Sequence, residues 1–373
     1  MERSQASAIQ NDLQKKIVLV SGPRQCGKTT LAQMLPGAKE YMNYDYAEHR
    51  DILREKSWDR RKSLLVFDEI HKMPDWKRYL KGIYDAEGIP PGILVMGSAR
   101  LDLIRRTGDS LAGRFFQHRL HPFDVKEARN EIEPEEAFKR ISRFGGFPEP
   151  FLANDAGFYN RWRRSHIDII LRQDMLDLES VRDIKSVEVL IDLLRSRVGS
   201  PISYASLARD LQKDAKTVKR WLEILESLYI IFPVRPYHRN VARSILKEPK
   251  YYFYDSAQVR GQIGARLENI VACALLKECH TQTDTYGRDV ELGYVRSKDG
   301  REIDFVIVED QWVRMMIETR SGGGFLSPHF SHFDRFFPDT KRLQVVHDLT
   351  REKTFPDGAE MRSVVPWLAE LSL

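Results

Sequence analysis

The hydrophobic pattern of the first 125 residues alternates between short apolar runs and longer amphipathic stretches. The apolar runs have the length of buried strands, which we expect at 17–21, 40–45, 64–68 and 93–97. Between them, apolar residues recur at helical spacing over 29–34, 47–56 and 75–85. Strands that alternate with helices predict a parallel sheet with helices on both of its faces.

The pattern changes after residue 125. Residues 126–198 carry apolar positions at helical spacing and predict a helical lid or linker. Residues 199–258 predict a small α+β segment, and residues 259–373 predict a final domain with one helix followed by several strands. We therefore expect an α/β protein with a core at 1–125 and these three further parts.

A phosphate-binding motif lies between the first predicted strand and the first predicted helix. Residues 22–29 read Gly-Pro-Arg-Gln-Cys-Gly-Lys-Thr and match the P-loop pattern G-x-x-x-x-G-K-[ST]. The backbone N–H groups of such a loop face phosphate oxygens. We expect Lys28 to reach the β- and γ-phosphates of ATP, and Thr29 to bind Mg²⁺. The expected nucleotide contacts are Gly22, Pro23, Arg24, Gln25, Cys26, Gly27, Lys28, Thr29, Thr30 and Asp68.

Two acidic residues end the third predicted strand. Asp68 and Glu69 follow the apolar run at 64–67. Asp68 is placed to hold the magnesium shell, and Glu69 to polarise the attacking water as a general base. Acids at a strand end also start turns, but after a P-loop this pair predicts a site of ATP hydrolysis.

Three further features are candidates for the same site. Ser98 follows the strand at 93–97 and either senses the γ-phosphate or caps a helix. Arg114 precedes a fifth strand and either acts on a neighbouring subunit as an arginine finger or forms a surface ion pair. The Gly-Gly-Phe-Pro run at 145–148 either lines the adenine pocket or forms an interhelical turn.

The net charge of +5 is concentrated in one segment. Residues 203–247 hold nine Lys or Arg against four Asp or Glu. Their periodicity predicts a helix-turn-helix over 204–228, with basic residues at the start of the second helix, where recognition helices contact DNA. A winged-helix DNA contact is therefore expected, and a packing or protein-contact module is the alternative. The expected DNA contacts are Lys216, Lys219, Arg220 and Arg239.

These motifs together resemble one family. The chain resembles the AAA-type ATPases of bacteria and archaea that join an N-terminal AAA domain to an uncharacterised C-terminal domain with a restriction-endonuclease-like core. The resemblance rests on the P-loop, Phe-Asp-Glu at 67–69, Gly-Ser-Ala-Arg at 97–100, Leu-Ala-Gly-Arg at 111–114, Gly-Gly-Phe-Pro-Glu at 145–149 and Arg-Glu-Ile-Asp-Phe at 301–305. It implies a ring-like, hexamer-like homo-oligomer.

The resemblance also implies an acidic site in the C-terminal domain. Metal-dependent nucleases of the resembling fold use a helix Glu, a strand Asp and a Glu-x-Lys, which correspond here to Glu268, Asp304 and Glu318. The lysine position is Arg320, which cannot act as a base. We expect a vestigial nuclease site that does not cut DNA; a structural ion-pair network with Arg320 and Arg301 is the alternative.

Composition adds limits on location and partners. Three cysteines without metal-ligand spacing indicate a reducing cytosol, and no apolar run approaches the roughly 18 residues that span a bilayer. We expect a cytoplasmic ATPase that uses ATP and Mg²⁺ as an oligomeric motor on duplex or branched DNA, with branch migration or remodelling as its role. A regulatory or scaffold ATPase with protein-binding modules and an ATP-gated nuclease are the alternatives.

Overall fold

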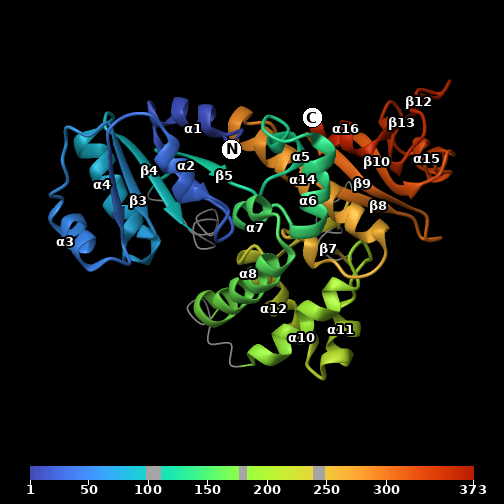
Figure 1. The fold of residues 1–373 in the computed structure, drawn as a ribbon, viewed down its shortest axis with the longest axis horizontal. Helices are drawn as coiled ribbons and strands as arrows, with labels where there is room; N and C mark the ends of the chain where they lie inside the picture. The colour runs from blue at the N-terminus through green and yellow to red at the C-terminus, as the bar shows by residue number, and fades with distance from the viewer. Residues whose placement is uncertain (98–110, 176–182, 238–247) are drawn as a thin grey trace. The chain divides into compact units, whose positions relative to one another are not determined.

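The computed structural model of the protein describes residues 1–97, 111–175, 183–237 and 248–373 (Figure 1). These residues form two compact units. The smaller unit holds Glu2–His121 and Asp284–Gly287, and the larger holds Met1, Pro122–Thr283 and Arg288–Leu373. None of the helices in the described part of the chain has the length and hydropathy needed to cross a membrane.

The smaller unit is built on a five-stranded parallel sheet in the order β2-β3-β4-β1-β5. Its strands are β1 (Ile17–Ser21), β2 (Lys39–Asn43), β3 (Leu64–Asp68), β4 (Gly92–Gly97) and β5 (Phe115–Arg119). Its helices are α1 (Ala6–Leu13), α2 (Lys28–Met34), α3 (Ala47–Glu55) and α4 (Trp76–Glu87), with a 3-10 turn η1 (Ile70–Lys72). All neighbouring strands pair in parallel, which confirms the predicted α/β fold of this region.

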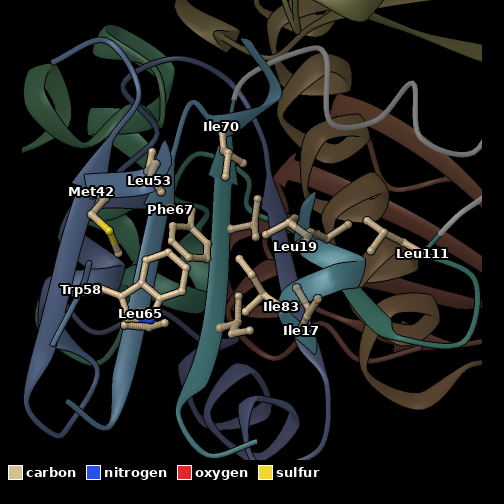
Figure 2. Close-up of a cluster of buried hydrophobic side chains, with 13 residues drawn as sticks. Ile17, Leu19, Met42, Leu53, Trp58, Leu65, Phe67, Ile70, Ile83 and Leu111 are labelled. Atoms are coloured by element: carbon tan, nitrogen blue, oxygen red, sulfur yellow. The ribbon is translucent and has the colours of Figure 1, made fainter. Parts of the chain in front are cut away.

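Apolar side chains pack tightly against this sheet (Figure 2). The strands β1, β3 and β4 are buried at every position. Burial on both faces explains why their sequences are unbroken apolar runs rather than alternating ones. The rings of Trp58 and Phe67 meet edge to face with centroids 5.9 Å apart, which anchors the β2–β3 side of this core.

The larger unit contains an eight-stranded mixed sheet in the order β12-β13-β11-β10-β9-β8-β6-β7. Its strands are β6 (Ile231–Pro236), β7 (Lys250–Phe253), β8 (Val290–Arg296), β9 (Glu302–Glu309), β10 (Trp312–Gly322), β11 (Lys341–Asp348), β12 (Lys353–Thr354) and β13 (Glu360–Ser363). The helices before this sheet are α5 (Val125–Ala128), α6 (Pro134–Phe144), α7 (Pro148–Ala153), α8 (Ala156–Ile169), α10 (Ile184–Arg195), α11 (Tyr204–Leu211) and α12 (Ala215–Ser227). The later helices are α14 (Ile263–Tyr286), α15 (His329–Asp334) and α16 (Val364–Ala369).

This sheet joins two segments that the sequence predicts as separate parts. The strands β6 and β7 come from the segment at 199–258, and β8 to β13 come from the final segment. β6 pairs with β8 in parallel, with Arg235 opposite Gly293 and Pro236 opposite Tyr294. The two segments therefore share one hydrogen-bonded sheet within one compact unit.

The Gly-Gly-Phe-Pro run forms the turn between α6 and α7. Gly145 has a φ of 73°, and a Cβ atom there would lie 2.0 Å from Oδ1 of Asp255. Burial raises the pKa of Asp255 to about 6, and its carboxylate accepts a 3.0 Å hydrogen bond from the hydroxyl of Tyr159. A Cβ at Gly146 would lie 2.2 Å from the carbonyl oxygen of Phe123. Both glycines are therefore required by close packing.

We expect Gly145→Ala to lower the free energy of unfolding by about 2 kcal/mol or more, because a side chain there meets a left-handed backbone and a buried carboxylate. Gly264→Ala at the start of α14 is the matched control, since nothing lies within 4 Å of its Cβ position. Alanine is the better helix former, so the control should be neutral or stabilising. Urea unfolding measures both; equal stability of Gly145→Ala and the natural protein would show that this turn is not constrained.

Candidate nucleotide-binding site

The P-loop connects the end of β1 to the start of α2, as the sequence predicts. Gly22 follows β1 directly, and a Cβ atom there would lie 2.2 Å from the carbonyl oxygen of Leu120. Gly27 has a left-handed φ of 95° and precedes the first helical residue, Lys28. Neither position accepts a side chain without displacement or strain of the backbone.

Lys28 is a buried cation whose hydrogen bonds go to carbonyl groups of its own loop. Its Nζ donates to the oxygen of Gly22 at 2.9 Å and to that of Pro23 at 2.7 Å. In the described part of the chain, no ion pair joins Lys28 to a carboxylate. Burying a charge without a direct ion-pair partner is unfavourable, so this environment suits an anionic ligand such as a phosphate group.

The N-terminal segment supports this loop. Arg3 is buried, and its Nη1 donates to the carbonyl oxygen of Cys26 at 2.7 Å. Its Nη2 donates to the carbonyl oxygen of His121. Sequence analysis missed Arg3, because a single arginine in a polar segment carries no signal that distinguishes it from a solvated one.

Asp68 and Glu69 lie at the carboxyl end of β3, and only β4 separates β3 from β1. Burial raises the pKa of Asp68, while the nearby charge of Lys28 opposes that shift. Glu69 has a left-handed φ of 56°, and its N–H donates to the carbonyl oxygen of Met96 at 3.0 Å. Left-handed non-glycine residues are strained and gather at functional sites.

The side chain of Glu69 lies close to two basic groups. Its Oε2 is 3.4 Å from Nε2 of His71 and 3.6 Å from Nζ of Lys72. The shorter ion pair of Lys72 is with Asp45, whose Oδ2 lies 2.6 Å from Nζ of Lys72. These contacts hold the carboxylate near the strand end without a short hydrogen bond to either basic group.

Tyr41 is a second residue that the sequence analysis missed. Its hydroxyl donates to Oδ2 of Asp68 at 2.5 Å. The contact depends on the pairing of β2 with β3, and strand order cannot be read from local periodicity.

The donor set fits ATP with magnesium. Thr29 and Asp68 supply the oxygen ligands that Mg²⁺ prefers, directly or through water. Lys28 and the loop N–H groups supply the positive potential that phosphate groups require. The ion, when bound, would neutralise charge on the β- and γ-phosphates.

Two of the predicted functional residues, Ser98 and Arg239, lie outside the described residues.

Arg114 lies at the amino ends of the parallel strands, whereas the P-loop of its own chain lies at their carboxyl ends. Its carbonyl accepts a hydrogen bond from the N–H of Ile17 at the start of β1, whereas the P-loop follows the end of that five-residue strand. Its guanidinium binds both carboxylate oxygens of Asp85, at 2.7 and 3.1 Å. The predicted ion pair is present, and the role in a neighbouring subunit stays a prediction.

The predicted basic helix is α12. Its N-terminus is capped by Asp214, whose carboxylate accepts from the N–H of Thr217 at 2.8 Å. Lys216, Lys219 and Arg220 are all exposed near this end. The apolar residues of α12 are buried, which leaves the basic residues on the solvent side. Basic residues at the N-terminal end are expected of a DNA-contacting helix, and the contact itself stays a prediction.

Lys250 lies among the acids of the predicted vestigial nuclease site. Its Nζ is 2.6 Å from Glu302, 3.4 Å from Glu268 and 3.9 Å from Asp304. Its side chain is 1% exposed. Burial alone would lower the pKa of Lys250, but the three acids raise it above its ordinary value. The cluster is therefore held by a charged lysine from β7.

The remaining predicted members have their own partners. Oδ2 of Asp304 accepts from both the N–H and the hydroxyl of Thr319 at 2.8 Å. Glu318 is buried and lies 3.5 Å from Arg320; burial and the charge of Asp304 raise its pKa to about 8. Of the two arginines expected in the alternative ion-pair network, Arg320 lies near Glu318, whereas Arg301 pairs with Asp299 at 3.0 Å.

These contacts do not fit a bound metal ion. The ammonium group of Lys250 already lies between the helix and strand carboxylates. Across the described residues, no group of three His, Cys, Asp or Glu side chains is arranged to hold an ion. The acids therefore form an ion-pair cluster centred on Lys250.

Comparison with known families assigns the N-terminal region. Residues 14–129 match the family described as AAA domain. Residues 135–266 and 263–368 match two domains of unknown function, DUF8612 and DUF4143. The restriction-endonuclease-like character of the C-terminal part stays a prediction.

Similar proteins do not extend this assignment to a function. An uncharacterized protein of Mycobacterium tuberculosis is 27% identical over 252 residues, which cover 66% of this chain and 56% of that protein. An uncharacterized protein of Methanocaldococcus jannaschii is 26% identical over 267 residues, which cover 65% of this chain and 58% of that protein. The chain spans about half the length of the curated relatives it matches.

Among solved structures, the Thermotoga maritima RuvB Holliday junction branch migration motor is similar to this chain. It is 20% identical and has a TM-score of 0.32, with 61% of this chain and 85% of that chain covered. A TM-score of this size is too low to carry a conclusion about function. Any functional conclusion therefore rests on the AAA domain and on the geometry of its site.

The Lys250 cluster leads to a stability prediction. We expect Lys250→Met to lower the free energy of unfolding by about 3–5 kcal/mol, because three acids lose their counter-charge. Burial raises the pKa of Glu268 although Lys250 opposes this shift, so removal of the lysine raises that pKa further. The loss of stability in the variant, relative to the natural protein, should therefore be smaller at pH 5 than at pH 8.

Lys341→Met is the matched control, because its ammonium is 3.6 Å from Glu360 in a half-exposed pair. Exposed pairs contribute about 1 kcal/mol or less. Denaturant unfolding at both pH values compares the two variants. Equal, pH-independent losses would contradict the assignment of Lys250 as a buried counter-charge.

Proposed function

We propose that this protein hydrolyses ATP with magnesium in its AAA domain, and that it works on DNA as an oligomer. The observation that carries the first part is the buried Lys28, bound to loop carbonyls and without a carboxylate partner among the described residues. Asp68 and Glu69 lie at the end of a nearby strand of the same sheet. Lys28 is thus suited to binding phosphate, and the nearby acids are suited to binding magnesium and activating water.

The residues divide the chemistry between them. Lys28 exchanges its carbonyl partners for the β- and γ-phosphates, and the loop N–H groups orient the triphosphate. Thr29 and Asp68 would hold the magnesium shell. Glu69 accepts a proton from the attacking water as its oxygen bonds to the γ-phosphorus and the bond to the β–γ bridging oxygen breaks. ADP and phosphate are the products.

The position of Arg114 supports an oligomeric enzyme. The P-loop lies at the opposite end of the strands, and the five residues of β1 separate the two ends. Strands rise about 3.3 Å per residue. An arginine side chain cannot cover that distance within its own subunit. We propose that Arg114 leaves Asp85 and reaches the γ-phosphate bound by a neighbouring copy in a ring-like, hexamer-like assembly.

The exposed basic end of α12 supports DNA as the partner. Lys216, Lys219 and Arg220 are grouped where a recognition helix meets the phosphate backbone. The proposed motor acts on duplex or branched DNA, with branch migration or remodelling as its role. The Lys250 cluster argues against nuclease activity, because its acids already have a cation.

The catalytic proposal is tested first by two variants. Lys28→Ala should abolish nucleotide binding, because it removes the charge that meets the phosphates. Glu69→Gln should bind ATP with magnesium normally and turn it over at least about 100-fold more slowly, since general-base catalysis contributes about that much or more. Equilibrium binding and phosphate release measure the two effects; near-normal turnover by Glu69→Gln would remove Glu69 from that role.

The role of Arg114 is tested by mixing variants. Arg114→Ala should bind ATP normally and hydrolyse it at least about 1,000-fold more slowly. Mixing it with Lys28→Ala protein should restore part of the activity, because a mixed assembly contains sites with both an intact P-loop and an intact arginine. Co-purification of the untagged variant with a tagged copy of the other confirms that mixed assemblies form. Assembly without any rescue would contradict action between subunits.

The DNA proposal is tested by removing three charges together. Changing Lys216, Lys219 and Arg220 to Ala should weaken duplex DNA binding and flatten its salt dependence. Each lost phosphate contact lowers the slope of log affinity against log salt by about 0.9. ATPase rates with single-stranded, duplex and four-way DNA then show whether binding is coupled to turnover.

A matched control removes three exposed basic residues elsewhere in the same unit. Lys298, Arg351 and Lys353 changed to Ala alter the net charge equally. DNA affinity should change much less in this control. Equal effects in both triple variants would show that only net charge matters, and unchanged binding in the α12 variant would assign that helix to packing or protein contact.

A further inference from the structure

Tyr41 contacts one of the side chains expected to surround magnesium, and no motif assigns it a role. Its hydroxyl donates to Oδ2 of Asp68 at 2.5 Å. Asp68 ends β3, whereas Tyr41 lies within β2. The hydroxyl group therefore reaches from the neighbouring strand to the acidic strand end.

The sheet determines where this hydroxyl lies. β2 pairs with β3 in parallel, with Tyr41 opposite Val66 and Asn43 opposite Asp68. Directly opposite residues share one face of a sheet, and alternate residues along a strand return to that face. Tyr41 and Asp68 therefore lie on the same face of the sheet, offset by two residues along the paired strands. The length of a tyrosine side chain covers that offset.

We propose that Tyr41 is a positioning residue for magnesium: its hydroxyl holds Oδ2 of Asp68 and so limits rotation of that carboxylate. This role rests on the ATP site proposed above and deepens it. With one carboxylate oxygen held, Oδ1 is left for the ion or its water shell. Phenylalanine at this position would fill the same space but leave Asp68 to rotate.

A fixed carboxylate favours magnesium over larger ions. Mg²⁺ demands nearly ideal octahedral geometry with short bonds, whereas Ca²⁺ accepts variable geometry at longer distances. Loss of a hydrogen-bond partner behind a metal ligand commonly lowers metal affinity about 10–100-fold. Tyr41→Phe should therefore weaken the response to Mg²⁺ more than the response to Ca²⁺.

The test uses the full chain and a fluorescent, non-hydrolysable ATP analogue. Binding is titrated in EDTA and then at rising concentrations of Mg²⁺ or Ca²⁺. Tyr41→Phe should keep its affinity in EDTA, because Lys28 and the loop remain in place. Its half-maximal Mg²⁺ concentration should rise about 10-fold, with a smaller rise for Ca²⁺.

Tyr79→Phe is the matched control. The Tyr79 hydroxyl also makes a 2.5 Å hydrogen bond in the same unit, to the carbonyl oxygen of Leu53, and the side chain is partly buried. This variant loses a comparable hydrogen bond away from the site, so its Mg²⁺ requirement should equal that of the natural protein. The affinity in EDTA reports directly on whether each variant retains a folded P-loop.

Three results would overturn the proposal in distinguishable ways. An unchanged Mg²⁺ requirement in Tyr41→Phe would show that the hydroxyl does not position the ion's ligands. An equal loss of affinity in EDTA and in Mg²⁺ would show that Tyr41 supports the loop instead. If the natural protein binds no nucleotide in either condition, the proposed ATP site itself fails, and the first titration reveals this.

Discussion

A buried positive charge without a carboxylate partner among the described residues is the constraint on which the nucleotide site depends. Lys28 is held in place by carbonyl groups of a loop that two glycines bend and that Arg3 supports from the N-terminal segment. Such a charge is unfavourable in isolation and becomes favourable when an anion arrives. The parallel sheet then brings Asp68 and Glu69 to the same edge, so the phosphate site and the acidic site are formed by one local architecture.

The larger unit contains the opposite arrangement. Lys250 is even more deeply buried than Lys28, but three carboxylates surround it. This pairing connects β7 to α14 and β9 and helps to join two segments into one sheet. Each buried cation requires a counter-charge. At Lys28 a ligand can supply it, whereas at Lys250 the protein's own carboxylates supply it. The contrast supports a catalytic N-terminal unit and a structural acid cluster in the C-terminal part.

The sequence predicted the N-terminal parallel sheet well because its signals are local. Unbroken apolar runs located β1, β3 and β4 within a residue, and the P-loop and acidic pair follow directly from those strands. The helix α1 was missed because only Ile9 and Leu13 of its eight residues are buried, which is too few to produce a periodic pattern.

The residues that the sequence did not predict depend on contacts between distant segments. Tyr41 acts through the pairing of β2 with β3, and Lys250 meets acids that lie 18, 52 and 54 positions further along the chain. A basic residue near a predicted DNA-binding segment looks solvated until the sheet places it among acids. The vestigial metal site was inferred from the family resemblance, and the unexpected lysine changed its interpretation.

The most direct test of the central claim is amide hydrogen exchange of the full chain with and without ATP and Mg²⁺. Peptides covering residues 22–30 should exchange more slowly with nucleotide, because their N–H groups and Lys28 gain phosphate partners. Peptides around Lys250 should not change, because that cation already has its counter-charges. Absence of protection at residues 22–30 under saturating ATP and Mg²⁺ would contradict the account.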